Sequence, residues 1–212
     1  MTFVNNLLNM NLALKTTGTF LLVVLLFGMM ACSKSHLTVT QQIDLDKKAK
    51  AGLVAALVDL PPAGGSRPYP SQEVEKEARE IAQALVDQTR ETNKDFKMNT
   101  SPKWHNVMIK MGSRKKGYCY QWVPELLKAL PPQPMKYFER HWGGSFLSLG
   151  RENNAVIITK RSAPLETGLV YDAWRGVGRP FWIPVSQDKH YQWSERFNEI
   201  EILTGQAKVE AK

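Results

Sequence analysis

The chain has 212 residues, of which 43% are hydrophobic and 23% are charged. These values are typical of a globular protein and exclude a collagen, a coiled coil or a fully disordered chain. Lys and Arg number 28 against 20 Asp and Glu, which gives a net charge of +8. Only two cysteines are present, Cys32 and Cys119, which excludes a disulfide-stapled mini-protein and a Cys-rich zinc module.

The first 31 residues have the pattern of an export signal. Lys15 precedes an apolar run over residues 19–31 that is short for a transmembrane helix and suits the hydrophobic region of a secretory signal peptide. The run ends in Met29–Cys32, which resembles the lipobox of bacterial lipoproteins. The resemblance implies cleavage before Cys32 and its modification with acyl chains such as palmitate. Two or three acyl chains anchor a protein stably, whereas one is marginal.

Ser33 follows Cys32, and the absence of Asp at this place in a Gram-negative lipoprotein implies the outer membrane, with the mature chain facing the periplasm. The expected partners are the membrane, through the lipid anchor, and peptidoglycan or another envelope protein. Export from the cytoplasm argues against a nucleic-acid partner. An ordinary signal peptide or an uncleaved anchor is the alternative interpretation of the N-terminus.

Three parts are expected in the mature chain, namely a tether, a helical segment and a core, over residues 32–42, 43–100 and 101–212. A linker rich in Pro and Gly, residues 60–70, divides the helical segment. The spacing of apolar residues predicts a helix on either side of this linker, over 43–58 and from Ser71 to about Thr92.

The core begins with two predicted helices, Pro102–Gly112 and Tyr118–Leu130, separated by the basic loop Ser113–Gly117. After Met135, short runs rich in aromatic and β-branched residues alternate with turn signals, as antiparallel strands do. They predict strands over 136–147, 153–160, 168–174 and 180–185. Helices followed by strands predict an α+β fold, with N-terminal helices packed on a small antiparallel sheet.

Cys119 is the first candidate for chemistry. If Cys32 is acylated, Cys119 is the one remaining thiol, in an oxidising compartment. It begins a predicted helix and follows Arg114, Lys115 and Lys116, and both the helix dipole and these charges stabilise a thiolate. The alternative is a partly buried, inert cysteine.

A nucleophilic thiolate also needs a base, and the base needs an orienting group. His141 lies in a predicted strand and is the candidate base. Asp172 is the candidate orienting group, since a carboxylate in a short apolar strand is costly to bury without a partner. No histidines or cysteines have metal-ligand spacing, so neither a metal nor a cofactor is expected.

A Cys at a helix start, followed by antiparallel strands, resembles the papain-like thiol hydrolases, and in particular transglutaminase-like and CHAP or NlpC/P60-type domains. Gly117–Val123 looks like their nucleophile segment, Asn154–Thr159 like their His-bearing strand and Leu169–Trp174 like their acid-bearing strand. The similarity covers roughly residues 112–175. Where the family pattern places the catalytic His, this chain has Asn153 and Asn154, whose amides do not titrate near neutrality.

Two hypotheses follow. In the first, a membrane-anchored thiol hydrolase or acyltransferase acts on amide bonds in peptidoglycan or peptides. Cys119 is its nucleophile, His141 its base and Asp172 its orienting group, and Asn154 is a polar orienting group or oxyanion donor.

In the second hypothesis, a non-catalytic lipoprotein binds an envelope polymer or a protein partner. Its binding surface consists of aromatic and basic residues, among them Arg175 and Arg179 in a glycine-containing loop.

Overall fold

The structure is a computed structural model that describes residues 38–64, 71–146 and 152–208. The expected signal segment and Cys32 lie outside these ranges. The chain divides into two compact units, Met1–Gln42 and Ile43–Lys212. Helix α2 (Val39–Val58) crosses the division, so that residues 39–42 of the expected tether are helical. Across the described ranges, no helix combines the length and the apolar character needed to cross a bilayer.

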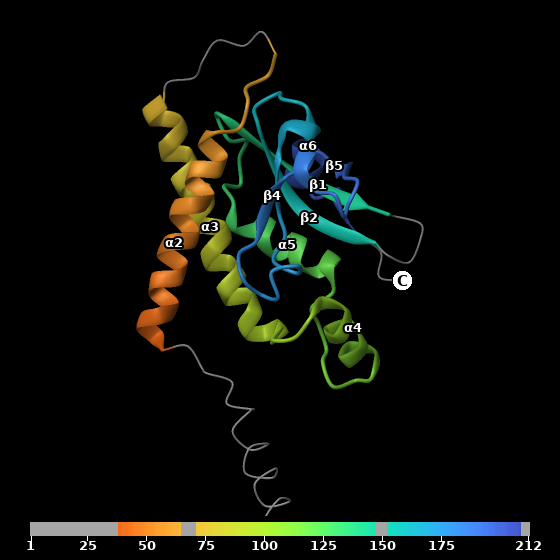
Figure 1. Cartoon of the computed structure of the whole chain (residues 1–212). Helices are drawn as coiled ribbons and strands as arrows, with labels where there is room; N and C mark the ends of the chain where they lie inside the picture. The colour runs from red at the N-terminus through yellow and green to blue at the C-terminus, as the bar shows by residue number, and fades with distance from the viewer. Residues whose placement is uncertain (1–37, 65–70, 147–151, 209–212) are drawn as a thin grey trace, which may run out of the picture. The chain divides into compact units, whose positions relative to one another are not determined.

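Within Ile43–Lys212, helices precede an antiparallel sheet, which confirms the predicted α+β fold (Figure 1). The helices that follow α2 are α3 (Ser71–Phe96), α4 (Pro102–Lys110) and α5 (Cys119–Ala129), with the short α6 (Glu199–Leu203) near the C-terminus. The strands are β1 (Phe138–Ser145), β2 (Asn153–Lys160), β3 (Leu169–Tyr171), β4 (Trp182–Pro184) and β5 (Ser194–Phe197).

The five strands form one sheet in the order β4-β3-β2-β1-β5, and every neighbouring pair is antiparallel. Trp142 of β1 pairs with Val156 of β2, and Gly144 pairs with Asn154. Paired residues point to the same face of a sheet and alternate residues point to opposite faces. This register therefore places the side chains of Trp142, Val156 and Asn154 on one face.

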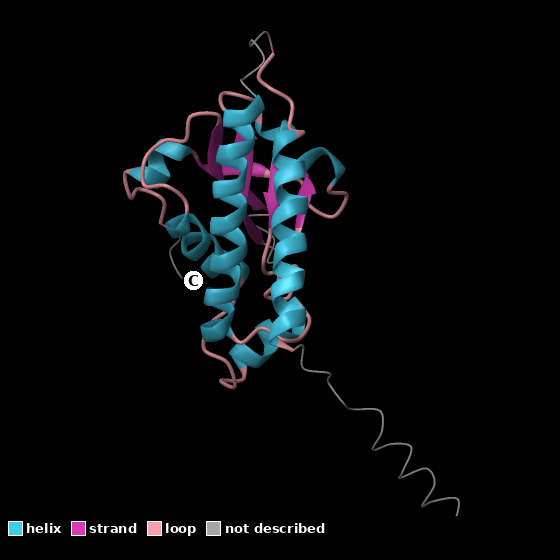
Figure 2. Ribbon diagram, turned by 90° about the vertical axis from the view of Figure 1, so that its left-hand side faces the viewer, coloured by secondary structure: helices cyan, strands magenta, loops and turns pink. Residues whose placement is uncertain are grey.

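The helices cover that face, and the two long helices lie side by side in front of the sheet (Figure 2). Helix α3 packs by a single apolar stripe, since its buried residues recur at helical spacing while Glu, Lys and Arg occupy the outer side. The helix layer and the sheet share one core, whose members include Leu53, Leu57, Ile81, Leu85, Trp122, Leu126, Trp142, Val156 and Ile158.

A smaller cluster covers the opposite face. Ala155, Ile157 and Val170 are buried there, against Ile183 of β4 and side chains of the connections that flank it. Strand β3 ends at Tyr171, three residues before the end of the predicted strand 168–174, so Asp172 lies in the turn that follows β3. The end of β3 and the start of β2 lie at the same end of the sheet, because these strands are antiparallel.

Candidate functional site

Cys119 is the first residue of α5, on the helix-covered side of the sheet. Gly117 precedes it with a φ of +119°, in the region that favours glycine. A Cβ at Gly117 would lie 2.4 Å from Nε2 of His105, so only glycine lets the chain pass this close to α4. The first turn of α5 is closed by Gln121, whose side-chain oxygen accepts hydrogen bonds from the backbone N–H groups of Gly117 and Tyr118.

The thiol of Cys119 has two polar neighbours at the start of β2. Its Sγ donates a hydrogen bond to the backbone oxygen of Glu152 at 3.5 Å, and Nδ2 of Asn154 lies 3.8 Å from Sγ. Nδ2 of Asn154 also donates to Oε1 of Glu152 at 2.9 Å. Oδ1 of Asn154 accepts from Nε1 of Trp142 at 2.8 Å and from Arg196 at 3.0 Å. The amide of Asn154 is therefore fixed with its nitrogen toward the sulfur.

Burial governs the protonation of this thiol. Desolvation raises the pKa of Cys119 to about 11, although the hydrogen bonds from Asn154 act in the opposite direction. The basic loop does not reverse this effect, because Lys116 is paired with Asp95 at 2.9 Å and Arg114 donates to the backbone oxygen of Ser113. At neutral pH, Cys119 is a protonated thiol.

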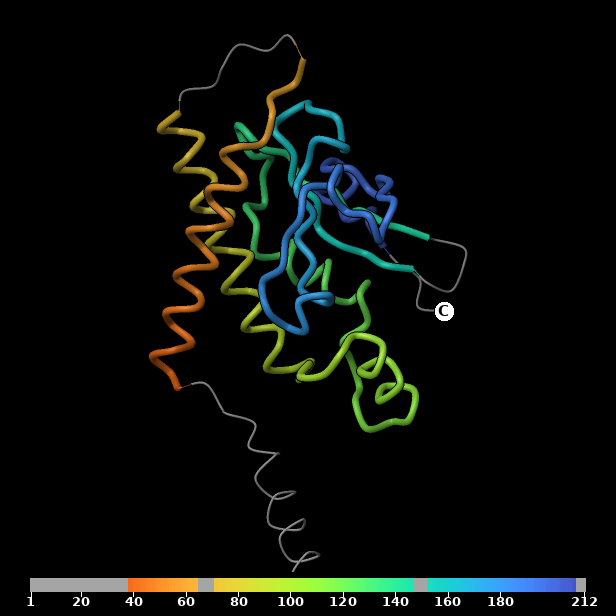
Figure 3. Tube along the Cα trace, viewed as in Figure 1, coloured from red at the N-terminus to blue at the C-terminus, as the bar shows by residue number. Residues whose placement is uncertain are grey.

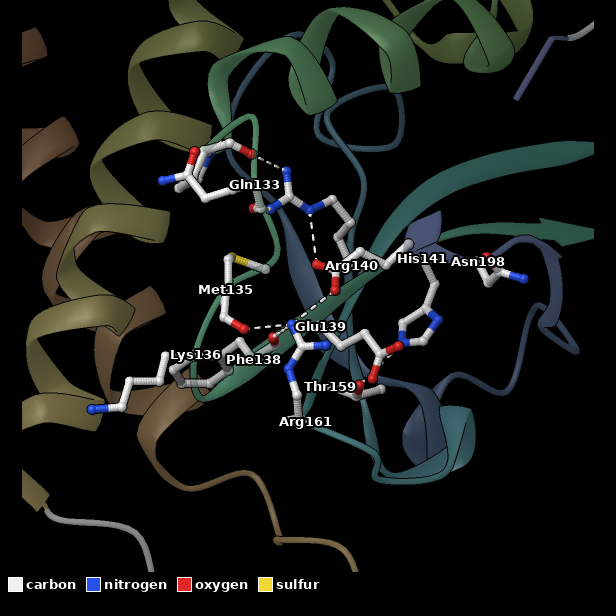
Figure 4. Close-up of polar contacts among 12 residues, drawn as sticks. Gln133, Met135, Lys136, Phe138, Glu139, Arg140, His141, Thr159, Arg161 and Asn198 are labelled. Carbon is white, nitrogen blue, oxygen red and sulfur yellow. Dashed lines mark hydrogen bonds and ion pairs between the residues drawn. The ribbon is translucent and has the colours of Figure 1, made fainter. Parts of the chain in front are cut away.

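His141 lies on the opposite face of the sheet from Cys119, since it is the neighbour of Trp142 along β1. In Figure 4, His141 lies beside Thr159, whereas Arg140 extends toward Gln133. The Nε2 atom of His141 is 3.0 Å from Oγ1 of Thr159, and its Nδ1 contacts Oε1 of Glu195. The structure does not bring the expected base to the expected nucleophile.

The imidazole of His141 lies between the carboxylate of Glu195 and the hydroxyl of Thr159, within hydrogen-bond contact of both. This is the arrangement of carboxylate, imidazole and hydroxyl in a hydrolytic triad. However, Thr159 is 0% exposed, so no substrate reaches its hydroxyl. The three side chains belong to β5, β1 and β2, and their hydrogen bonds join these neighbouring strands.

Asp172 contacts Asn153 and Arg175 instead of His141. Its Oδ2 accepts from Nδ2 of Asn153 and from Nε of Arg175, both at 2.8 Å, and Oδ1 accepts from the backbone N–H of Arg175. Burial raises the pKa of Asp172, and Arg175 opposes this shift. The Oδ1 atom of Asn153 accepts from the backbone N–H of Asn154, so Asp172 reaches the Cys119 region through two asparagines.

Arg175 belongs to the interior and not to a free basic loop. Besides Asp172 it pairs with Asp188 at 2.8 Å. Its guanidinium carbon lies 4.8 and 4.9 Å from the ring centroids of Phe181 and Tyr191. Only Arg179 of the two expected binding arginines has an exposed side chain.

A groove of about 470 Å³ opens beside the Cys119 region. It is lined by Phe96, Lys116, Tyr120, Gln121, Pro124, Glu125, Trp142, Ala207 and Lys208. Tyr120 adjoins Cys119 in the chain, and Trp142 is the residue that binds Asn154. The groove is of the size that accommodates a small ligand or a few polymer units.

The partners of Asn154, namely Glu152, Trp142 and Arg196, are not among the site residues predicted from the sequence. Trp142 lies in a predicted strand, and the alternation of side chains along a strand places it on the same face as Phe138, which is a signal for its position in the site. Arg196 belongs to β5, which no sequence pattern predicts.

In the ranges 38–64, 71–146 and 152–208, no group of three or more His, Cys, Asp or Glu side chains is placed to hold a metal ion. Comparison of the chain with family models, curated proteins and solved structures finds no match.

Proposed function

We propose that this protein is a lipid-anchored bacterial envelope protein that binds peptidoglycan and does not cleave it. The observation that carries the proposal is a groove lined by Tyr120 and Trp142, next to a thiol that has an amide where a thiol hydrolase needs a base. The export signal and the lipobox-like segment ending at Cys32 support the location at the outer membrane, facing the periplasm.

The lining of the groove suits a polymer of sugars and short peptides. Aromatic rings stack on the apolar faces of sugar rings, and Tyr120 is partly exposed for such a contact. Lys208 offers an ammonium group to the carboxylates of stem peptides, beside Lys116, which is paired with Asp95, and the side-chain NH2 of Gln121 can donate to the peptide carbonyls.

Two features favour binding over catalysis. A general base must reach the proton that it removes, directly or through one water, and His141 is on the other face of the sheet. Furthermore, a thiol with a pKa of about 11 supplies very little thiolate at neutral pH. Asn154 holds the thiol but cannot accept its proton.

Cosedimentation with purified peptidoglycan sacculi tests the proposal. The full chain is solubilised in detergent and its bound fraction is measured for the wild type and for Tyr120→Ala, Cys119→Ser and Phe146→Ala. We expect Tyr120→Ala to lose most of the binding, whereas Cys119→Ser retains it. Phe146 is the matched aromatic control, because it is 38% exposed and does not line the groove. Equal binding by Tyr120→Ala and the wild type would contradict the proposal.

A thiol hydrolase or acyltransferase is the second candidate. It is favoured by the location of Cys119 at the start of α5, facing Asn154 at the start of β2, with Asp172 joined through Asn153, which is the order of the papain-like resemblance. The same incubations with peptidoglycan sacculi decide between the binding protein and the enzyme. Release of soluble fragments from sacculi by the wild type and its loss in Cys119→Ala would establish the enzyme and overturn the binding proposal.

The lipid anchor has its own test. Mass spectrometry of the protein purified from bacterial membranes should show an acylated Cys32 at the N-terminus, and Cys32→Ala should leave the chain uncleaved. A mature N-terminus at another residue, without acyl groups, would indicate an ordinary signal peptide instead.

A further inference from the structure

Helix α4 presents apolar side chains to solvent. Trp104 is 55% exposed, Val107 is 37% exposed and Met111, directly after the helix, is 73% exposed. His105 on the inner side of α4 is 0% exposed, and its Nε2 donates to the backbone oxygen of Lys116 at 2.9 Å. The buried His105 thus fixes which side of α4 faces outward.

The chain around α4 is strongly basic. Between Asp95 and Glu125 there is no acidic residue, while the basic residues in this stretch are Lys97, Lys103, Lys110, Arg114, Lys115 and Lys116. Lys103, Lys110 and Lys115 are exposed, and Lys103 and Lys110 belong to α4 itself, as do Trp104 and Val107. We refer to Trp104, Val107 and Met111 together with these three lysines as the α4 face.

The α4 face is accessible to a large partner. Figure 3 shows the chain from α4 to the start of α5 as an excursion that projects from the helix layer. In the part of the chain that the structure describes, α3 and α5 are linked to the sheet through the shared core, but α4 contributes none of the hydrophobic residues of that core. The exposed apolar surface of α4 therefore does not serve packing.

We propose that the α4 face docks on the surface of a bilayer that contains anionic phospholipids. A short helix with Trp on one side and lysines around it lies in the plane of the interface, where the indole enters the headgroup region. The lysines bind the anionic headgroups, and the stretch between Asp95 and Glu125 adds no acidic side chain that would repel them. This contact adds to a lipid anchor because it fixes which side of the domain faces the membrane, and it does not rest on peptidoglycan binding.

Quenching of Trp104 fluorescence by brominated lipids tests the contact. The full chain, purified from membranes, is reconstituted into vesicles of phosphatidylcholine with or without phosphatidylglycerol. The chain has 6 tryptophans. The difference in fluorescence between the wild type and Trp104→Phe therefore isolates the signal of Trp104 from the signals of the other five. We expect quenching of Trp104 in the anionic vesicles, and its loss in neutral vesicles and at high salt.

Charge reversal provides the matched comparison. Lys103→Glu combined with Lys110→Glu should abolish the Trp104 signal, whereas Lys48→Glu combined with Lys189→Glu, two exposed lysines outside the α4 face, should retain it. Circular dichroism confirms that the variants are folded. Trp104 quenching that is absent from anionic vesicles, or that is unchanged by Lys103→Glu with Lys110→Glu, overturns the proposal and points to a protein partner. The sacculus assay with Tyr120→Ala is unaffected by either result, so the two proposals fail separately.

Discussion

The side-chain nitrogen of Asn154 lies 3.8 Å from the sulfur of Cys119, and the oxygen of the same amide is held by Trp142 and Arg196. Because the oxygen is occupied, the amide is fixed as a hydrogen-bond donor toward the thiol. A donor steadies sulfur but removes no proton from it. A donor of this kind favours the thiolate and opposes the effect of burial, so it is desolvation that keeps Cys119 a thiol despite a favourable helix dipole.

We expect alkylation of Cys119 by iodoacetamide to be slow at neutral pH and to increase toward pH 11. The reason is that burial raises the pKa of this thiol to about 11. The measurement uses a chain carrying Cys32→Ser, in which Cys119 is the only thiol. Unfolding the same chain should restore a midpoint near ~8.5, the value of an ordinary cysteine. Rapid labelling of the folded chain at pH 7 would show an activated thiolate.

Arg175→Ala should destabilise the fold by about 3–5 kcal/mol, the cost of removing one partner from a buried ion pair. The substitution leaves the carboxylates of Asp172 and Asp188, which are almost fully inaccessible, without their common cation. Without Arg175 the pKa of Asp172 moves further up, so the loss should be larger at pH 7 than at low pH, where the carboxyl is protonated.

Urea unfolding at two pH values measures this effect. Arg179→Ala is the control, and we expect a change within about 0.5 kcal/mol for this exposed neighbour. If Arg175→Ala and Arg179→Ala behaved alike, the buried pairing would have no energetic role.

Glu199→Ala should also be strongly destabilising, by about 3 kcal/mol. Glu199 accepts from Arg140 at 3.2 Å and from Arg161 at 2.7 Å, and Arg140 is 1% exposed. Removal of the carboxylate leaves Arg140 with the backbone oxygens of Pro131 and Gln133 as its remaining partners. Thermal unfolding measures the loss.

Glu199→Gln keeps two polar atoms at this place and should cost less than Glu199→Ala. Glu166, an exposed acid, supplies the control Glu166→Ala. A melting temperature that is the same for Glu199→Ala and Glu166→Ala would rule out a stabilising role for the contact of α6 with β1.

Lys160→Met should stabilise the protein below pH 8. Lys160 is 4% exposed with its Nζ 4.2 Å from the ring centroid of Phe138, and burial lowers its pKa from 10.5 to about 8. Between pH 8 and 10.5 the unfolded chain binds more protons than the folded chain, so the stability of the wild type rises with pH. The advantage of Lys160→Met should therefore shrink across this interval, whereas Lys189→Met should show no such trend.

Melting temperatures from pH 6 to 10.5 measure this difference. An advantage for Lys160→Met that grew with pH would contradict a lowered pKa of the lysine.

Much of the fold was predictable, because local pattern and tertiary packing agree. Strand β2 occupies the predicted residues 153–160, and α5 differs from the predicted helix by one residue at either end. Strand β5 could not be predicted, since Ser194–Phe197 has no apolar alternation and becomes a strand only by pairing with β1. Helix α3 extends to Phe96 and not to Thr92, because Phe96 packs edge-on against Trp122 of α5.

The candidate site was harder to predict. Alternation correctly separates His141 from Trp142 on β1, but it does not say which of the two faces receives the helices. The apolar pair Phe138 and Trp142 marks the helix side, so His141 falls on the other side. Likewise, the long-range contacts of Arg175 with Asp188 and of Asn154 with Arg196 join segments whose proximity depends on the completed sheet.

The sheet is open at both ends of its strand order, and this has a consequence for association. Exposed strands tend to pair with strands of other molecules. Strand β4 has only three residues and ends in Pro184, which has no N–H to donate. Strand β5 has four residues and carries Glu195 and Arg196. Short length, proline and charge are the features by which natural sheets blunt their edges, so both borders of this sheet disfavour pairing between copies of the chain.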